Sequence, residues 1–223
     1  WYLKNENKEP VYVLYHPAMM AYGNYFTNLK TIFFNPLEDK KTFYNLYKDS
    51  LNKLNDGDKV VLCGRWDIMY RSYCIENNLR VDQISLQKYT NAVILDLNEQ
   101  ISLHPNLKFY IVGCSFVPNK TAVIWSKVNL NESYLKKIIN TDLFKSTSDF
   151  EETYTTGINT KLIEFCKNKN NVIFIDRNAP LKEINSKYRI YRNNKGIFED
   201  PLHYSSFGGS IIGEYIIDEV SKE

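Results

Sequence analysis

Little in this sequence points to a membrane, to nucleic acid or to a metal ion. Its apolar runs all fall short of the length that spans a bilayer. Lys and Arg total 28 against 26 Asp and Glu, and no dense basic block indicates a nucleic-acid footprint. The four cysteines lack the close paired spacing of zinc sites. We therefore expect a soluble chain that holds no metal and binds no nucleic acid.

Glycine and cysteine are scarce, and their positions narrow the chemistry further. Gly23 stands alone after the first apolar run, and Gly208-Gly209 follow a histidine instead of joining a strand to a helix. No phosphate-binding loop is indicated, and no cofactor is expected. Cys63, Cys114 and Cys166 lie in or beside apolar runs, which predicts buried free thiols. The alternative is that two of the four cysteines form one disulfide.

The chain does have the length and apolar content for one domain with a substantial core, at 223 residues and 43% hydrophobic composition. Five short runs rich in β-branched and aromatic residues recur between longer segments. Their hydrophobicity is continuous, which is typical of strands covered on both faces. The predicted strands are Val11 to Tyr15, Thr31 to Phe34, Lys59 to Cys63, Lys108 to Val112 and Asn171 to Ile175.

Segments of helical period separate and follow these runs. Strands that alternate with helices imply right-handed crossovers and a parallel sheet. We predict an α/β fold in which three αβα layers surround a doubly wound, flavodoxin-like parallel sheet of five strands, within a single domain over residues 1–223. The apolar stripes of the predicted helices run from Phe43 to Leu54, from Ile84 to Ile101, from about Glu151 to Lys167, and from Ile211 to Val220.

An open parallel sheet places its working site at the carboxyl ends of its strands. His16 and Pro17 follow the first predicted strand, Arg65 and Trp66 follow the third, and Ser115 follows the fourth. We expect these residues to gather at one edge of the sheet.

The clearest chemical signal lies near the end of the chain, where Asp200 precedes His203 by three residues. A carboxylate at this spacing can hold one imidazole nitrogen in a fixed tautomer and leave the other free to take a proton. The alternative is a capping arrangement, in which Asp200 accepts backbone N–H bonds and His203 is a packed surface residue. Ser205 and Ser206 are N-cap candidates for the last predicted helix.

Three passages resemble the SGNH/GDSL hydrolases, and most of all the domains fused to membrane acyltransferases that O-acylate bacterial surface glycans. Asp200-x-x-His203 with the following Tyr-Ser-Ser-Phe-Gly-Gly is similar to the closing block of that family. Asp58 to Trp66 resembles a strand of the fused subgroup that ends in a small-Arg-Trp sequence, and Lys108 to Pro118 resembles a strand leaving into a proline-bearing loop.

The resemblance implies an SGNH-like fold and acetyl transfer or ester hydrolysis on a cell-surface carbohydrate. It also implies a glycan or acylated carbohydrate as ligand, a membrane acyltransferase domain or acyl donor as partner, and an extracytoplasmic location in the periplasm or at the cell surface. His203 is then the catalytic base and Asp200 its orienter.

The sequence departs from the family at the nucleophile. Where the family has Gly-Asp-Ser after the first strand, this chain has Tyr15-His16-Pro17. Proline at the serine position removes the hydroxyl, and it also removes the backbone N–H that the family uses to bind the oxyanion. We therefore expect no conventional serine esterase chemistry.

Four further residues are candidates for substrate binding, each with a plainer alternative. His16 suits a ligand or base at the sheet edge, or a structural histidine. Arg65 and Trp66 suit a carbohydrate or anion contact, whereas the alternative is a salt-bridged arginine and a core tryptophan. Ser115 follows a strand and a glycine, but its flanking sequence does not suit a nucleophile elbow. His104, beside Pro105, is expected to interact with helix-end carbonyls.

Two other functions remain open. The missing nucleophile favours a catalytically degenerate domain that binds a glycan or a partner protein. A transferase that uses a nucleotide-activated sugar is a further alternative with the same type of sheet.

Overall fold

A computed structural model describes residues 11–15, 31–33, 51–64, 66–118, 123–124, 149–182, 188–193 and 195–222. These residues form a mixed α/β structure, which confirms the α/β part of the predicted fold class. The predicted helix from Phe43 to Leu54 lies outside the described residues except at its end, where Leu51 is helical and buried.

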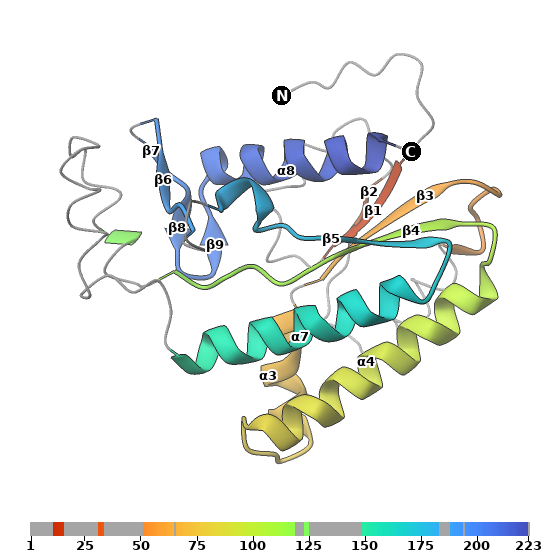
Figure 1. Cartoon of the computed structure of the whole chain (residues 1–223), viewed down its shortest axis with the longest axis horizontal. Helices are drawn as coiled ribbons and strands as arrows, with labels where there is room; N and C mark the ends of the chain where they lie inside the picture. The colour runs from red at the N-terminus through yellow and green to blue at the C-terminus, as the bar shows by residue number, and fades with distance from the viewer. Residues whose placement is uncertain are drawn as a thin grey trace.

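Short apolar runs form a sheet in the order β2-β1-β3-β4-β5 (Figure 1). Each described pairing between neighbouring strands of this sheet is parallel. The strand bounds agree with the predicted ranges to within one residue. The strands are β1 (Val11–Tyr15), β2 (Thr31–Phe33), β3 (Lys59–Cys63), β4 (Lys108–Val112) and β5 (Val172–Ile175).

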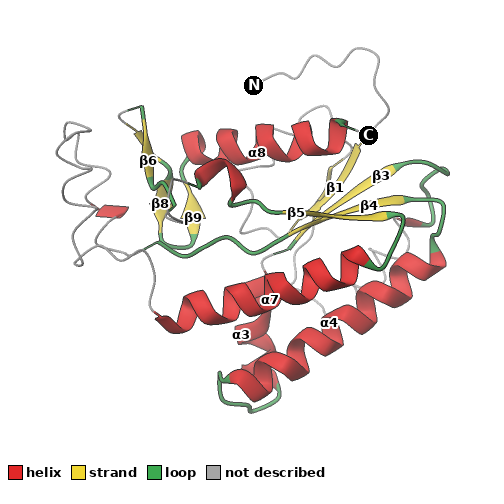
Figure 2. Cartoon of the chain, viewed as in Figure 1, coloured by secondary structure: helices red, strands yellow, loops and turns green. Residues whose placement is uncertain are grey.

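Helices lie on both sides of the described sheet (Figures 1 and 2). Alternate residues of β4 belong to two different cores. Phe109 and Ile111 pack on the side that carries three of the helices named next, and Tyr110 and Val112 pack on the side that carries the C-terminal helix. This continuous burial explains why the strand shows no alternation of polar and apolar residues. The helices are α3 (Trp66–Glu76), α4 (Gln83–Leu103) and α7 (Asp149–Lys167) on one side and α8 (Ser206–Ser221) on the other.

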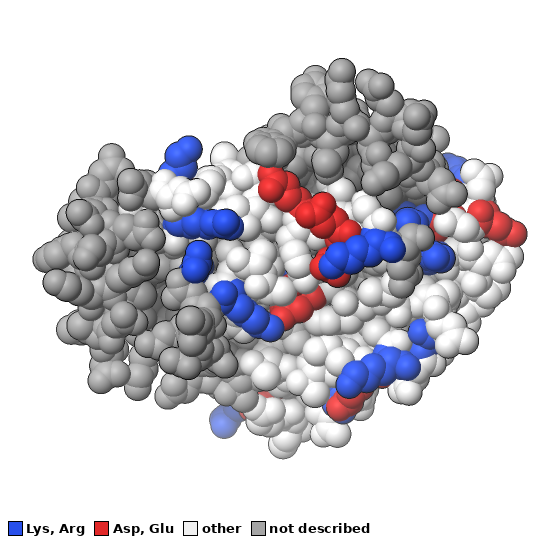
Figure 3. Space-filling model, turned by 45° about the horizontal axis from the view of Figure 1, so that its top comes forward, with Lys and Arg blue, Asp and Glu red and all other residues white. Residues whose placement is uncertain are grey.

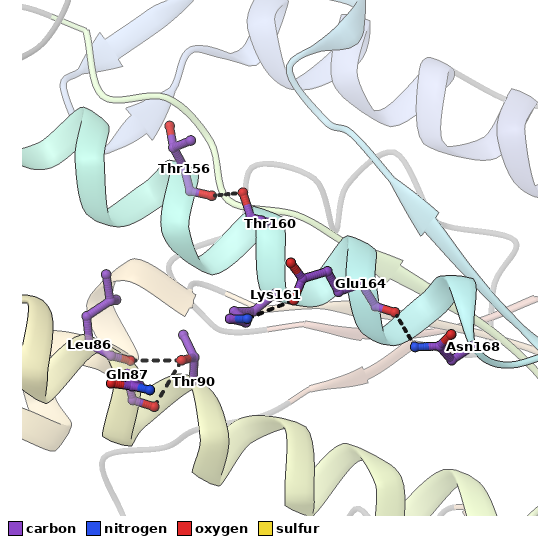
Figure 4. A network of polar contacts seen from close by, with 8 residues as sticks. All are labelled: Leu86, Gln87, Thr90, Thr156, Thr160, Lys161, Glu164 and Asn168. Atoms are coloured by element: carbon purple, nitrogen blue, oxygen red, sulfur yellow. Dashed lines mark hydrogen bonds and ion pairs between the residues drawn. The ribbon is translucent and has the colours of Figure 1, made fainter.

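The polar contacts drawn in Figure 4 each stay within α4 or within α7. The Thr90 and Thr160 hydroxyls each donate to the carbonyl four residues earlier, at 2.9 Å. Lys161 pairs with Glu164 at 2.7 Å on an exposed face of α7. Such contacts support helices without building a site, so this layer serves as scaffold.

Two small antiparallel ladders come between β5 and α8 along the chain, and the sequence analysis does not predict them. Strands of two or three residues are too short to show a periodicity. A 3₁₀ turn, η3 (Ala179–Leu181), precedes them. The ladders pair β6 (Tyr191–Arg192) with β7 (Lys195–Gly196), and β8 (Phe198–Asp200) with β9 (His203–Tyr204).

Helix α3 was also not predicted, since Trp66 was assigned only to the strand edge. The missed signal is a stripe of buried residues at helical spacing, Trp66, Tyr70 and Cys74. The prediction of buried thiols is confirmed: none of the four cysteines forms a disulfide, and all four are buried.

Candidate functional site

The β8–β9 hairpin brings Asp200 and His203 into direct contact. They are partners in the antiparallel register, and the Asp200 carboxylate Oδ2 lies 2.7 Å from His203 Nδ1. The other oxygen, Oδ1, accepts the Leu202 and His203 backbone N–H groups at 2.7 and 2.9 Å. The capping arrangement and the orienting arrangement therefore coexist, one on each oxygen of the same carboxylate.

Electrostatics keep this carboxylate ionised. Burial acts to raise the pKa of Asp200, but the hydrogen bonds from the His203 ring and from the Leu202 amide outweigh it, so the pKa lies below its ordinary value. An ionised carboxylate only accepts, so Nδ1 carries a ring proton, and the imidazole tautomer with its single proton there has Nε2 as its acceptor. The side chains remain 50% and 47% exposed. Nε2 makes no hydrogen bond with any described residue.

The start of α8 fixes the position of this hairpin. Ser205 is the N-cap: its Oγ accepts the Gly208 N–H at 3.1 Å and donates to the Gly196 carbonyl at 2.6 Å. A Cβ on Gly208 would overlap the Ile197 carbonyl oxygen, so only glycine permits this close approach. The Ser205 cap prediction is thereby confirmed, and the helix end is tied to β7.

Ser115 lies next to the hairpin but does not contact the imidazole in any recorded bond. Its Oγ is 2.5 Å from the Tyr204 hydroxyl and 2.9 Å from the Phe116 carbonyl oxygen. Tyr204 follows His203 on β9 and is buried. Ser115 thus connects the carboxyl end of β4 to the strand that carries the histidine.

Trp66 occupies the position that its core alternative describes. It is 7% exposed, and its indole Nε1 donates to the Val112 carbonyl at 2.8 Å. The ring covers Gly64, where an added Cβ would come within 2.8 Å of Trp66 Cε2. Its aromatic face is therefore not available to a carbohydrate at the surface. His16, Pro17 and Arg65 lie outside the described residues.

Sequence reasoning missed a buried polar group that follows β5. Arg177 is fully buried and donates through Nη2 to the Gly64 carbonyl at 2.9 Å. Asn178 donates to the Cys114 carbonyl at 2.9 Å and accepts the Phe116 N–H at 3.0 Å. Asn159 of α7 accepts the Cys114 N–H at 2.6 Å. The available signal was the position of Asp-Arg-Asn directly after a strand.

We call Trp66, Asn159, Arg177 and Asn178 the edge lock. Each of these side chains bonds to backbone at or just beyond the carboxyl end of β3 or β4. They hold the strand ends together beneath the hairpin.

In the described ranges, no group of three or more His, Cys, Asp or Glu side chains is arranged to hold a metal ion. No helix within those ranges is long and apolar enough to cross a membrane.

Comparisons with known proteins show a likeness of fold. No protein-family model matches this chain, and no curated protein matches it. A solved structure described as that of "a putative platelet activating factor from Streptococcus pneumonia" is similar at a TM-score of 0.52. The two are 13% identical, over 97% of this chain and 86% of the other. At that identity the likeness concerns the fold alone.

Proposed function

We propose that this chain is an SGNH-like domain that acts on acyl esters of a cell-surface carbohydrate, with His203 as general base and Asp200 as its orienter. The observation that carries the proposal is the 2.7 Å contact between Asp200 Oδ2 and His203 Nδ1, while Nε2 bonds none of the residues that the structure describes. The doubly wound, three-layer SGNH arrangement and an extracytoplasmic location are parts of the same proposal.

Two features of the fold support it. The sheet order β2-β1-β3-β4-β5 gathers the strand ends below the β8–β9 hairpin, where parallel sheets place ligands. The pair also stands directly before α8, which is where the resemblance requires the closing Asp-x-x-His block.

The chemistry follows from the open nitrogen. An acceptor hydroxyl on the sugar gives its proton to His203 Nε2 while its oxygen attacks the carbonyl carbon of an acyl donor. The resulting tetrahedral intermediate collapses, and the imidazolium returns the proton to the leaving group. Asp200 stays ionised and stabilises the imidazolium. With water as acceptor, the same steps hydrolyse an ester.

A covalent acyl-enzyme is not part of this scheme. In the resemblance, the serine position falls on Pro17, which has neither a hydroxyl nor a backbone N–H. Transfer therefore proceeds directly from donor to acceptor, with a possible membrane acyltransferase domain as the source of the acyl group.

A second candidate function is a degenerate domain that binds a glycan or a partner protein and does no chemistry. The Tyr15-His16-Pro17 sequence favours it, because it removes the nucleophile and one oxyanion donor together.

Activity on an ester separates the two. The purified chain would be assayed with p-nitrophenyl acetate and with an O-acetylated polysaccharide. General-base catalysis contributes about 10²–10⁴-fold, so His203→Ala should lower the rate by that factor. His104→Ala is the matched control, since that histidine lies at the far end of α4. Equal rates for wild type and His203→Ala, or no turnover above background, would reject the catalytic proposal in favour of binding.

A further inference from the structure

The β6–β7 hairpin carries two cations opposite one another. Arg192 and Lys195 are direct partners in the antiparallel register, one on each side of the turn at Asn193. Both are exposed. Like charges that face each other across a strand pair destabilise the pair. This hairpin therefore keeps an arrangement that folding alone does not favour.

Neither cation is neutralised by an acid within the described part of the chain. Neither Arg192 nor Lys195 forms an ion pair there, and the recorded contact of Lys195 is with an aromatic ring. Two described lysines elsewhere do pair with acids: Lys182 with Asp176 at 2.6 Å, and Lys161 with Glu164 at 2.7 Å. The hairpin cations are thus available to an external anion.

Contacts with the start of α8 connect this hairpin to the segment that carries His203. Lys195 Nζ lies 5.5 Å from the centre of the Phe207 ring, in the first turn of α8. Ser205, two residues after His203, donates to the carbonyl of Gly196, the neighbour of Lys195. The space-filling view shows Lys and Arg side chains together on one part of the described surface (Figure 3).

We propose that the β6–β7 hairpin binds an anionic group of the carbohydrate substrate, a carboxylate or a phosphate, while a hydroxyl elsewhere on the same glycan reaches His203 Nε2. This inference rests on the proposed function for the role of His203. The guanidinium of Arg192 offers a fork of donors that matches either anion, and Lys195 adds a point charge. Aromatic contact with Phe207 limits the positions that the Lys195 chain adopts.

The number of cations favours a charged sugar over a larger polyanion. Two opposite residues on paired strands are about 5 Å apart at their Cβ atoms, a span that suits one anionic group. Nucleic-acid binding usually relies on about 6–10 phosphate contacts. A glycan with an isolated uronate or phosphate therefore fits this hairpin better.

Binding of defined oligosaccharides tests the inference. Calorimetry would compare an oligogalacturonate, a phosphorylated oligomannose and a neutral dextran oligosaccharide. At least one anionic oligosaccharide should bind and the neutral one should not, with the preferred anion identifying carboxylate or phosphate. The double variant Arg192→Gln/Lys195→Gln should weaken that binding by about tenfold or more, as expected for lost charge-assisted hydrogen bonds. Lys161→Gln, which removes a paired lysine on α7, is the matched control.

Several results would overturn it: equal binding of neutral and anionic sugars, unchanged affinity in the double variant, or stronger binding of duplex DNA or anionic vesicles. Folding is checked by thermal unfolding, where removal of the like-charge pair should leave Tm equal or higher.

His203→Ala separates the two proposals. Anion binding that persists in a chain with no His203-dependent turnover rejects the catalytic proposal alone. Turnover that depends on His203 without any preference for charge rejects this inference alone.

Discussion

Two polar regions meet at the carboxyl end of the sheet, and they differ in how their side chains are used. In the edge lock, Arg177 and Asn178 are buried and bond to backbone. In the β8–β9 hairpin, Asp200 and His203 are about half exposed, and His203 Nε2 bonds no described residue. Polar side chains that are buried against backbone hold a fold together, whereas exposed ones with spare bonding capacity can meet a ligand. The comparison predicts that stability and activity separate between the two regions.

The largest loss of stability is expected where hairpin and helix touch. Gly208→Ala would drive a Cβ into the Ile197 carbonyl oxygen, and overpacking of this kind costs about 3 kcal/mol or more. Chemical denaturation measures the free energy of unfolding. Gly157→Ala is the control, because its Cβ would meet only the end of the flexible Leu86 side chain, at 3.0 Å. Equal stabilities of the two variants would contradict the close approach.

The next largest loss of stability is expected in the edge lock. Asn178→Ala removes the partner of the buried Phe116 N–H, at about 1–3 kcal/mol, whereas the Cys114 carbonyl keeps the 3.3 Å bond from Asn159 Nδ2. Asn168→Ala, which removes an exposed contact to Glu164, should change the free energy of unfolding by less than about 0.5 kcal/mol. A loss at Asn178 no greater than at Asn168 would remove the distinction between the regions.

Asp200→Asn should reverse the pattern. Because the pair is half exposed, its loss should cost under about 1 kcal/mol of stability. The ester rate, in contrast, should fall by about a hundredfold or more, since the asparagine no longer holds the ring in its working tautomer. A fall in stability without a fall in rate would assign Asp200 to the fold.

The same variant has a defined pH dependence. The pKa of Asp200 is lowered in the folded chain, so its contribution to stability is present above its ordinary pKa and is lost as the pH falls through the folded value. The stability difference between wild type and Asp200→Asn should therefore shrink below about pH 4. Denaturation at pH 7 and at pH 3 measures this stability difference. A difference that stays constant would contradict a lowered pKa of Asp200 in the folded chain.

The smallest effect concerns the interior thiols. Burial raises the pKa of Cys166 to about 12, so its thiol stays protonated at neutral pH. Iodoacetamide should leave Cys166 unmodified in the native chain and alkylate it after denaturation, as peptide mass spectrometry would show. Native alkylation at the rate of the unfolded chain would mean that this core opens.

The sequence predicts the sheet better than the hairpins, for a physical reason. Continuous burial gives β3 and β4 a pattern that can be recognised from residues alone. The facing of Arg192 and Lys195 depends on the register of a two-residue ladder, which leaves no pattern in the chain. Asp200 and His203 were identified because their contact spans only three positions. Arg177 was missed because its partner, Gly64, is far away in sequence.

The short reach of the Asp200–His203 contact has a consequence for how such a domain can change over time. The carboxylate is held by the backbone of its own turn, so four consecutive residues are enough to shape the pair. No described residue outside this turn takes part in those three bonds. A chain can therefore change elsewhere in its sequence and still inherit the geometry of the pair.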